Sequence, residues 1–320
     1  MGIRIYESLT TTSSPSPDTN VFGLFLVVLP PMLGGLLYGF DIGATSFVLA
    51  MLLKSPTPTN TPTPTLVGSS GDVVDHLWWE DLSSTRQGLI VSSLSLGALL
   101  GSHVLLVYLA KRIGRRTELR LCAVFYILGS VSNVLSGTLL KGCSFLGFAA
   151  LCFGRVLYGI GVGFVMHGAP AYLAEMSPSR IRGAVVSAKE TVIVGGIVLG
   201  YLVGNAVSSV SGDRGEDPAG WTKLYGFCGL MAVPMLALTR FIPRSMRWLL
   251  LRGCDEEARE SMKFVYLGDV TEEFETLKTN LRASAKEQRE EPSLLDPRYR
   301  KAIAASTGLI VFQQLSAQPR

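Results

Sequence analysis

Apolar residues are grouped along this chain in long runs that short polar segments separate. Six of the runs approach or exceed the roughly 20 residues that a helix needs to cross the hydrocarbon core of a bilayer. They cover residues 21–53, 87–110, 117–139, 145–173, 184–210 and 221–243. We therefore predict an all-α membrane protein in which residues 21–243 form a six-span transmembrane bundle.

The segments around this bundle have other patterns. Residues 1–20 are polar and rich in Ser, Thr and Pro, which predicts a disordered cytoplasmic tail. Residues 54–86 hold a TPTPTNTPTPT tract and several acids, so we expect a long aqueous loop. Residues 244–301 mix charges with apolar residues at helical spacing, which indicates amphipathic helices along the cytoplasmic face. An apolar run over residues 302–320 begins a seventh span but is too short to complete it, so we expect a truncated form.

The composition supports this class. The chain has 320 residues, of which 48% are hydrophobic and only 17% charged, and this balance excludes an ordinary soluble domain. The five cysteines show no CxxC spacing, so neither disulfides nor a metal site is indicated. The sequence contains no nucleophile with a neighbouring base and no phosphate-binding loop. We predict that it is not an enzyme, needs no cofactor and has no nucleic-acid partner.

Basic residues set the expected orientation. They concentrate in the loop after the second run, in the loop after the fourth run and directly beyond the sixth run. The alternate loops, residues 54–86 and 211–220, hold few basic residues and several acids. The positive-inside rule therefore places the amino terminus and the basic loops in the cytoplasm.

The fourth run contains Arg155, and the first contains Asp41 within GGLLYGFDIG. Charges at membrane depth are expensive, so they usually face a partner or a water-filled cavity. We expect Asp41 to be the counter-charge of Arg155. Gly159, Gly161 and Gly163 follow Arg155 and leave little side-chain bulk, which allows a neighbouring helix to come close.

Several motifs occur in a fixed order: GGLLYGFDIGATS, GRR, GRVLYGIGVG, YLAEMSPSRIRG, RWLLLRG and FQQLSAQP. In this order the chain resembles the sugar porter family of the major facilitator superfamily, with xylose–proton and glucose–proton symporters among its members. The resemblance implies twelve spans in two six-helix halves with a sugar bound between them, an arrangement suited to alternating access. It implies that this chain is the amino-terminal half with a partial seventh helix. Transport would then require the missing carboxy-terminal half.

The resemblance also implies site residues. Asp41 and Arg155 match the proton-coupling acid and its arginine: the cation favours the ionised acid while desolvation favours the protonated one. The alternative is a static ion pair. Gln313 and Gln314 match a sugar-binding pair of amides, although one of them could serve only in packing. Glu190 stands where many relatives place a sugar-binding glutamine, and its alternative is a surface-reaching carboxylate beside Lys189.

A third group implied by the resemblance is a cytoplasmic charge network that holds helix ends together. Its members in this sequence are Arg115, Arg116, Glu175, Arg182 and Arg247. Lys111 and Arg244 depart from the family pattern, so we expect a weakened lock or compensation by acids in residues 255–291. For His167 we favour an interhelical role over contact with substrate.

The resulting hypothesis is a multi-pass carrier that moves a hexose or a pentose together with protons through a lipid bilayer. One alternative is a non-transporting half that acts as a sensor or as the partner of an intact porter. Another is a facilitator for a different small organic solute. We expect the plasma membrane or the vacuolar membrane as its location, and favour the plastid envelope less, because the first residues lack the composition of a transit peptide.

Overall fold

A computed structural model describes residues 18–53, 78–79, 82–109, 112–214, 219–290 and 300–315. The chain divides into two compact units, Met1–Val270 and Thr271–Arg320, which are described separately. The expectations for residues 1–17, and those for nearly all of the loop at 54–81, fall outside the described residues.

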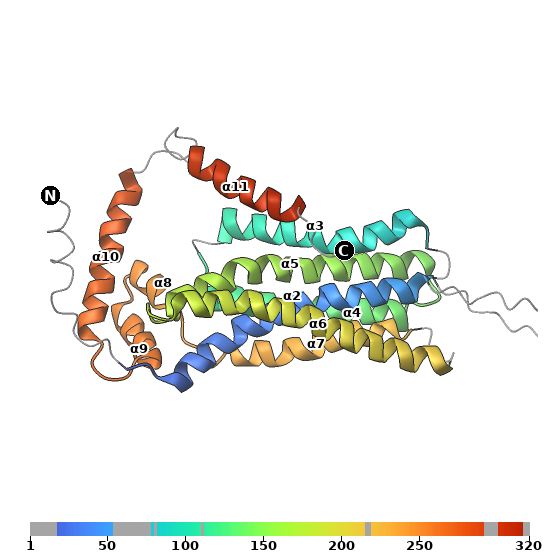
Figure 1. Cartoon of the computed structure of the whole chain (residues 1–320), viewed down its shortest axis with the longest axis horizontal. Coiled ribbons are helices and arrows are strands. Elements are labelled where there is room, and N and C mark those ends of the chain that lie inside the picture. Colours follow the sequence, from blue (N-terminus) through green and yellow to red (C-terminus); the bar gives the residue numbers. More distant parts are fainter. Residues whose placement is uncertain are drawn as a thin grey trace, which may run out of the picture. The chain divides into compact units, whose positions relative to one another are not determined.

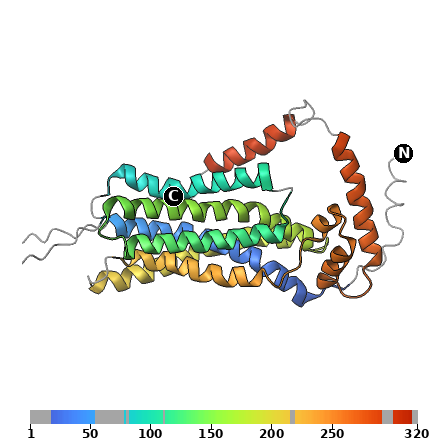
Figure 2. The ribbon, with the colours of Figure 1, turned by 180° about the vertical axis from the view of Figure 1, so that it is seen from behind.

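Six long helices run side by side in the first unit (Figures 1 and 2). They are α2 (Val21–Leu53), α3 (Ser84–Val104), α4 (Arg115–Thr138), α5 (Ser144–Met176), α6 (Arg182–Arg214) and α7 (Trp221–Leu238). A π-helical segment, η1 (Leu105–Leu109), extends α3. Each of the six is long and apolar enough to cross a membrane. The six predicted spans are therefore confirmed, with ends that shift by only a few residues.

The last span ends earlier than predicted, at Leu238 instead of residue 243. Beyond it the N–H groups of Arg240 and Phe241 donate to Ala237 and Leu238, three residues back, and tighten the chain into a turn. Pro243 follows and has no N–H group to continue a helix.

Two short helices, α8 (Met246–Leu251) and α9 (Asp255–Val265), lie at one end of the bundle (Figure 1). The side-chain oxygen of Ser245 caps α8 by accepting a hydrogen bond from Trp248 N. Three acids lie in the first turn of α9, where the positive end of the helix dipole stabilises their negative charges. In the second unit α10 (Thr271–Glu290) is amphipathic and α11 (Arg300–Leu315) is the helix of the predicted seventh run. Helices therefore occur within residues 244–301, the region whose residue pattern predicted amphipathic helices.

The start of the described chain is held by α9. Asn20 N donates to Val265 O at 2.8 Å, Leu267 N donates to Asp18 O at 2.7 Å, and Thr19 and Tyr266 form an antiparallel bridge. Residues 18–20 were expected in the disordered tail. That boundary is wrong, because these backbone groups find partners 244 residues or more further along the chain.

Glycines bring pairs of spans into backbone contact. A Cβ atom at Gly39 of α2 would overlap the carbonyl oxygen of Ile193 in α6. A Cβ at Gly159 or Gly163 of α5 would press on the carbonyls of Leu94 or Ala98 in α3. The close approach predicted for Gly159 and Gly163 is present, and small residues of this kind are what membrane helices use to pack tightly.

The bundle buries several charged and polar side chains among its apolar ones and exposes many large apolar side chains. Asp41, Glu118, Asn133, Arg155 and Lys189 are buried, whereas large apolar side chains such as Leu99, Phe153 and Leu202 are exposed. Exposed apolar surface on this scale requires a non-aqueous surrounding. Together with the six membrane-length helices, this surface identifies a multi-pass integral membrane protein.

Candidate functional site

The centre of the bundle contains an ion pair between α2 and α5. Arg155 Nη1 donates to Asp41 Oδ1 at 2.6 Å, and both side chains are buried, 1% and 0% exposed. The two charges that were expected to meet therefore do so, although the residues are 114 positions apart in the sequence. Burying two charges costs desolvation free energy, which their attraction offsets only when the two groups are in close contact. Loss of one partner would leave the other charge buried and uncompensated.

Aromatic residues surround the pair. The Arg155 guanidinium lies 5.5 Å from the ring centroid of Tyr225 on α7, within the range of a cation–π interaction. On the α5 side Tyr158 donates its hydroxyl to Leu37 O at 3.0 Å and stacks on Tyr126 of α4, with 4.3 Å between ring centroids. These contacts connect the four helices α2, α4, α5 and α7 around one pair of charges.

Glu190 lies one residue beyond a buried lysine. Lys189 Nζ contacts Glu190 Oε1 at 2.8 Å; the lysine side chain is 3% exposed and the glutamate side chain 66%. Tyr38 of α2 is close enough to interact electrostatically with both Glu190 and Asp41. Glu190 is thus an exposed carboxylate beside Lys189, and a contact with sugar stays a prediction.

Gln313 and Gln314 lie in α11, in the second unit. Their side chains fall outside the described part of the chain. Their proposed contact with sugar therefore stays a prediction.

Only part of the predicted cytoplasmic network is made of ion pairs. Arg115 lies 3.5 Å from Glu175 Oε1, and its closer partner, at 2.7 Å, is Glu118 Oε1. Glu175 accepts a second hydrogen bond from the Ser245 hydroxyl, in the segment that precedes α8. Arg115 and Glu175 therefore connect the ends of α4 and α5 to the chain that follows α7.

Three of the predicted network arginines have no ion pair among the described residues. Arg116 donates to two carbonyls beyond the end of α7, Thr239 O and Arg240 O, both at 2.8 Å. Arg182 donates to Ser177 O at 3.4 Å, and Arg247 is exposed. Salt bridges at these three positions therefore stay a prediction, and in this structure Arg116 satisfies backbone carbonyls left open where α7 stops.

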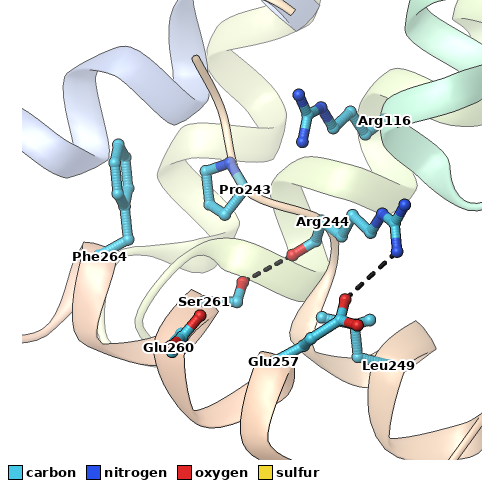
Figure 3. Close-up of a pocket in the computed structure, with 8 residues that line it drawn as sticks. All are labelled: Arg116, Pro243, Arg244, Leu249, Glu257, Glu260, Ser261 and Phe264. Carbon is cyan, nitrogen blue, oxygen red and sulfur yellow. Dashed lines mark hydrogen bonds and ion pairs between the residues drawn. The ribbon is translucent and has the colours of Figure 1, made fainter. Parts of the chain in front are cut away.

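Arg244 forms an ion pair with an acid of α9. Arg244 Nη1 donates to Glu257 Oε2 at 3.2 Å, and Ser261 Oγ donates to Arg244 O at 2.6 Å (Figure 3). These residues line a pocket of about 510 Å³ together with Arg116, Pro243, Leu249, Glu260 and Phe264. Glu257 belongs to the acidic region 255–291 in which compensation was expected. Both charges are half exposed, so the pair is weak by itself.

Glu118 is the site residue that sequence reasoning missed. It is fully buried, accepts from Arg115 through one oxygen, and lies 3.1 Å from His167 Nδ1 through the other. His167 therefore has the interhelical contact predicted for it. A signal was available, since an acid three residues after an arginine on a helix often pairs with it. Within the described ranges no three His, Cys, Asp or Glu side chains group closely enough to hold a metal ion.

Comparison with known proteins places this geometry in context. Residues 27–318 match the family model described as "Sugar (and other) transporter". Two similar proteins from Arabidopsis thaliana are D-xylose-proton symporter-like 3, chloroplastic and D-xylose-proton symporter-like 2. Each is 35% identical over 98% of this chain, which covers 53% and 58% of them.

A solved structure shares the fold. It is that of the proton:xylose symporter XylE from E. coli bound to 6-bromo-6-deoxy-D-glucose, with a TM-score of 0.67 and 27% sequence identity. The match covers 83% of this chain and 55% of that one. The chain thus spans about half the length of the proteins that it matches.

Proposed function

Because the chain belongs to the sugar transporter family of the major facilitator superfamily, a family of membrane transporters and not of enzymes, we propose that it takes part in proton-coupled monosaccharide transport. The observation that carries this proposal is the buried Asp41–Arg155 pair. Relatives and a structural neighbour named as xylose–proton symporters support the choice of proton and sugar.

The pair suits proton coupling for a physical reason. Asp41 is an acid whose ionised form is favoured by Arg155 and disfavoured by burial, so the two effects oppose each other. Protonation removes the negative charge, and Arg155 then loses its ionic partner. In the proposed mechanism this loss changes the contact between α2 and α5 and permits the bundle to reorient. A static pair would only tie the two helices together.

The sugar is proposed to bind at the interface between this bundle and a second one. Because the chain spans about half the length of its relatives, transport is proposed only for a protein that supplies that second bundle. Gln313, Gln314 and Glu190 are the proposed sugar contacts from this chain. Amides both donate and accept hydrogen bonds, and a carboxylate accepts them, so these groups match sugar hydroxyls.

The cytoplasmic residues are proposed to control which side opens. Arg115, Glu175 and Ser245 join α4, α5 and the segment before α8, while Arg244 and Glu257 join that segment to α9. Opening towards the cytoplasm would separate such ends. A contact that is made in one conformation and absent from the other changes the free-energy difference between the two conformations, and therefore their populations.

The test is uptake of labelled xylose and glucose into proteoliposomes, with and without an inwardly directed proton gradient. We expect accumulation with the gradient when the chain is joined to a second six-helix half, and none with a protonophore. The Asp41→Asn variant should exchange sugar across the membrane but not accumulate it. Accumulation by this variant would exclude Asp41 as the coupling acid, and accumulation by the 320 residues alone would exclude the need for a second half.

We propose the plasma membrane or the vacuolar membrane as the location, although one relative carries "chloroplastic" in its name. Fluorescence from a carboxy-terminal fusion at the plastid envelope would contradict this proposal.

A further inference from the structure

The Asp41–Arg155 pair is joined through only one atom of each group. Arg155 Nη1 and Asp41 Oδ1 are in contact, whereas Arg155 Nε and Asp41 Oδ2 have no hydrogen-bond partner among the described residues. An arginine and a carboxylate that interact as a fork make two parallel bonds and fix each other's orientation. The guanidinium of Arg155 is held at one end only, so it can turn without first breaking a second bond.

The other helices around Arg155 carry polar groups without partners. Ser130 Oγ and both amide atoms of Asn133 on α4 are buried and unpaired within the described ranges. The hydroxyl of Tyr225 on α7 is buried as well, and its neighbour is Thr45 of α2, whose own hydroxyl donates to Asp41 O. Asn133 Oδ1 lies against Gly154, the residue before Arg155. Ser130 lies against Gly229, one turn along α7 from Tyr225, whose ring is 5.5 Å from the guanidinium. Asn133 thus contacts α5 at the residue before Arg155, Ser130 lies between α4 and α7, and the Tyr225 ring lies against the guanidinium itself.

Unpaired groups of this kind need an explanation, because nearly all buried polar atoms in proteins have a partner. Ser130, Asn133 and Tyr225 each carry an oxygen that can accept a hydrogen bond from a guanidinium, and the Tyr225 ring offers its face to the same cation. We infer that Ser130, Asn133 and Tyr225 form a second arginine site, which the Arg155 guanidinium occupies once Asp41 has taken up a proton.

The inference rests on the proposed proton coupling and adds the destination of the released charge. A cation that loses its partner inside a membrane is costly unless other groups receive it. Moving from Asp41 to the second arginine site exchanges a contact with α2 for contacts with α4 and α7. Protonation would thereby change which helices Arg155 ties together.

Other ionisable groups face the pair from each helix packed around it. They are Tyr38 on α2, Tyr126 on α4, Cys152 and Tyr158 on α5, and Tyr225 and Cys228 on α7, while Cys122 adjoins Tyr126 and Glu190 on α6 lies near Tyr38. The tyrosines and cysteines are neutral at physiological pH. Within the described bundle, Asp41 is therefore the acid whose charge decides where Arg155 points.

The experiment is a double-mutant cycle on the 320-residue chain in detergent, read as melting temperature. Asp41→Asn stands for the protonated acid and keeps its shape. In the parent chain, Tyr225→Phe and Asn133→Leu should leave the melting temperature unchanged or raise it, because each removes a buried polar group. In the Asp41→Asn background the same changes should lower it by several degrees, because Arg155 then depends on those groups.

Ser177→Ala provides the matched control. Ser177 Oγ is also buried and unpaired, but it lies at the end of α5, about six helical turns from Arg155. It should show no coupling to Asp41→Asn. If Asn133→Leu does not fold, Ser130→Ala and Tyr225→Phe each delete a single oxygen and give the same comparison.

Equal effects in both backgrounds would overturn the inference, and so would the same coupling at Ser177. The cycle requires no transport. If the uptake assay excludes proton-coupled transport, the result of the double-mutant cycle still stands. If the cycle shows no coupling, the uptake assay still tests the role of Asp41.

Discussion

Glu118 and His167 join α4 to α5 inside the bundle, with 3.1 Å between Glu118 Oε2 and His167 Nδ1. The same carboxylate receives Arg115 on its other oxygen at 2.7 Å. One fully buried acid thus links an arginine at the start of α4 to a histidine on the neighbouring span.

Replacing this acid should be costly. Glu118→Gln keeps the size of the side chain but removes the charge that both partners face, and we expect a loss of about 2 kcal/mol of stability. The measurement is thermal unfolding in detergent. Glu256→Gln changes an exposed acid on α9 and should have little effect. Equal effects of the two substitutions would show that the contacts of Glu118 add nothing.

The central ion pair should behave as a unit. Arg155→Leu leaves Asp41 buried without its cation, and we expect a loss of roughly 3–5 kcal/mol. The double variant Asp41→Leu with Arg155→Leu should be more stable than Arg155→Leu alone, because no buried charge is left unpaired. Unfolding of the single and double variants measures the coupling. A double variant that shows the sum of the two single losses would contradict a direct interaction.

Two adjacent glycines on α6 provide a test of backbone contact. A Cβ at Gly196 would overlap Leu36 O in α2, whereas a Cβ at Gly195 meets no atom within 4 Å. Gly196→Ala should therefore cost about 1–3 kcal/mol. Gly195→Ala should be neutral or stabilise by up to about 1 kcal/mol through helix propensity. A reversed order of the two variants in thermal unfolding would mean that α2 and α6 pack differently.

Glu190 tests the proposed sugar site. If its carboxylate accepts a hydrogen bond from a sugar hydroxyl, Glu190→Gln retains an acceptor and should change KM for uptake only slightly. Glu190→Leu removes the acceptor and should raise KM about tenfold, which corresponds to about 1.4 kcal/mol. Thr191→Val, at the next exposed position, is the control. A KM unchanged in Glu190→Leu would leave Glu190 only its contact with Lys189.

The sequence was sufficient to predict the six spans and the central pair. Long apolar runs determine where helices cross a bilayer, and two charges within such runs have few partners other than each other. This is why Asp41 and Arg155 can be paired from the sequence alone, although 114 positions separate them.

The charges at the helix ends were harder to predict, because several partners are available there. Arg116 uses the open carbonyls of α7 and Glu118 takes Arg115, and both outcomes depend on where α7 stops and how α4 is rotated. The burial of Lys189 beside the exposed Glu190 likewise follows from the close contact of α2 and α6. The spacing of apolar residues in the sequence carries no information about these contacts at the helix ends and between the helices.

The backbone bridge between residues 18–20 and the end of α9 has a bearing on synthesis. Leu267 N, which donates to Asp18 O, does not exist until the ribosome has passed all six membrane spans. The start of the first span can therefore be joined to the end of α9 only after all six spans have been synthesised.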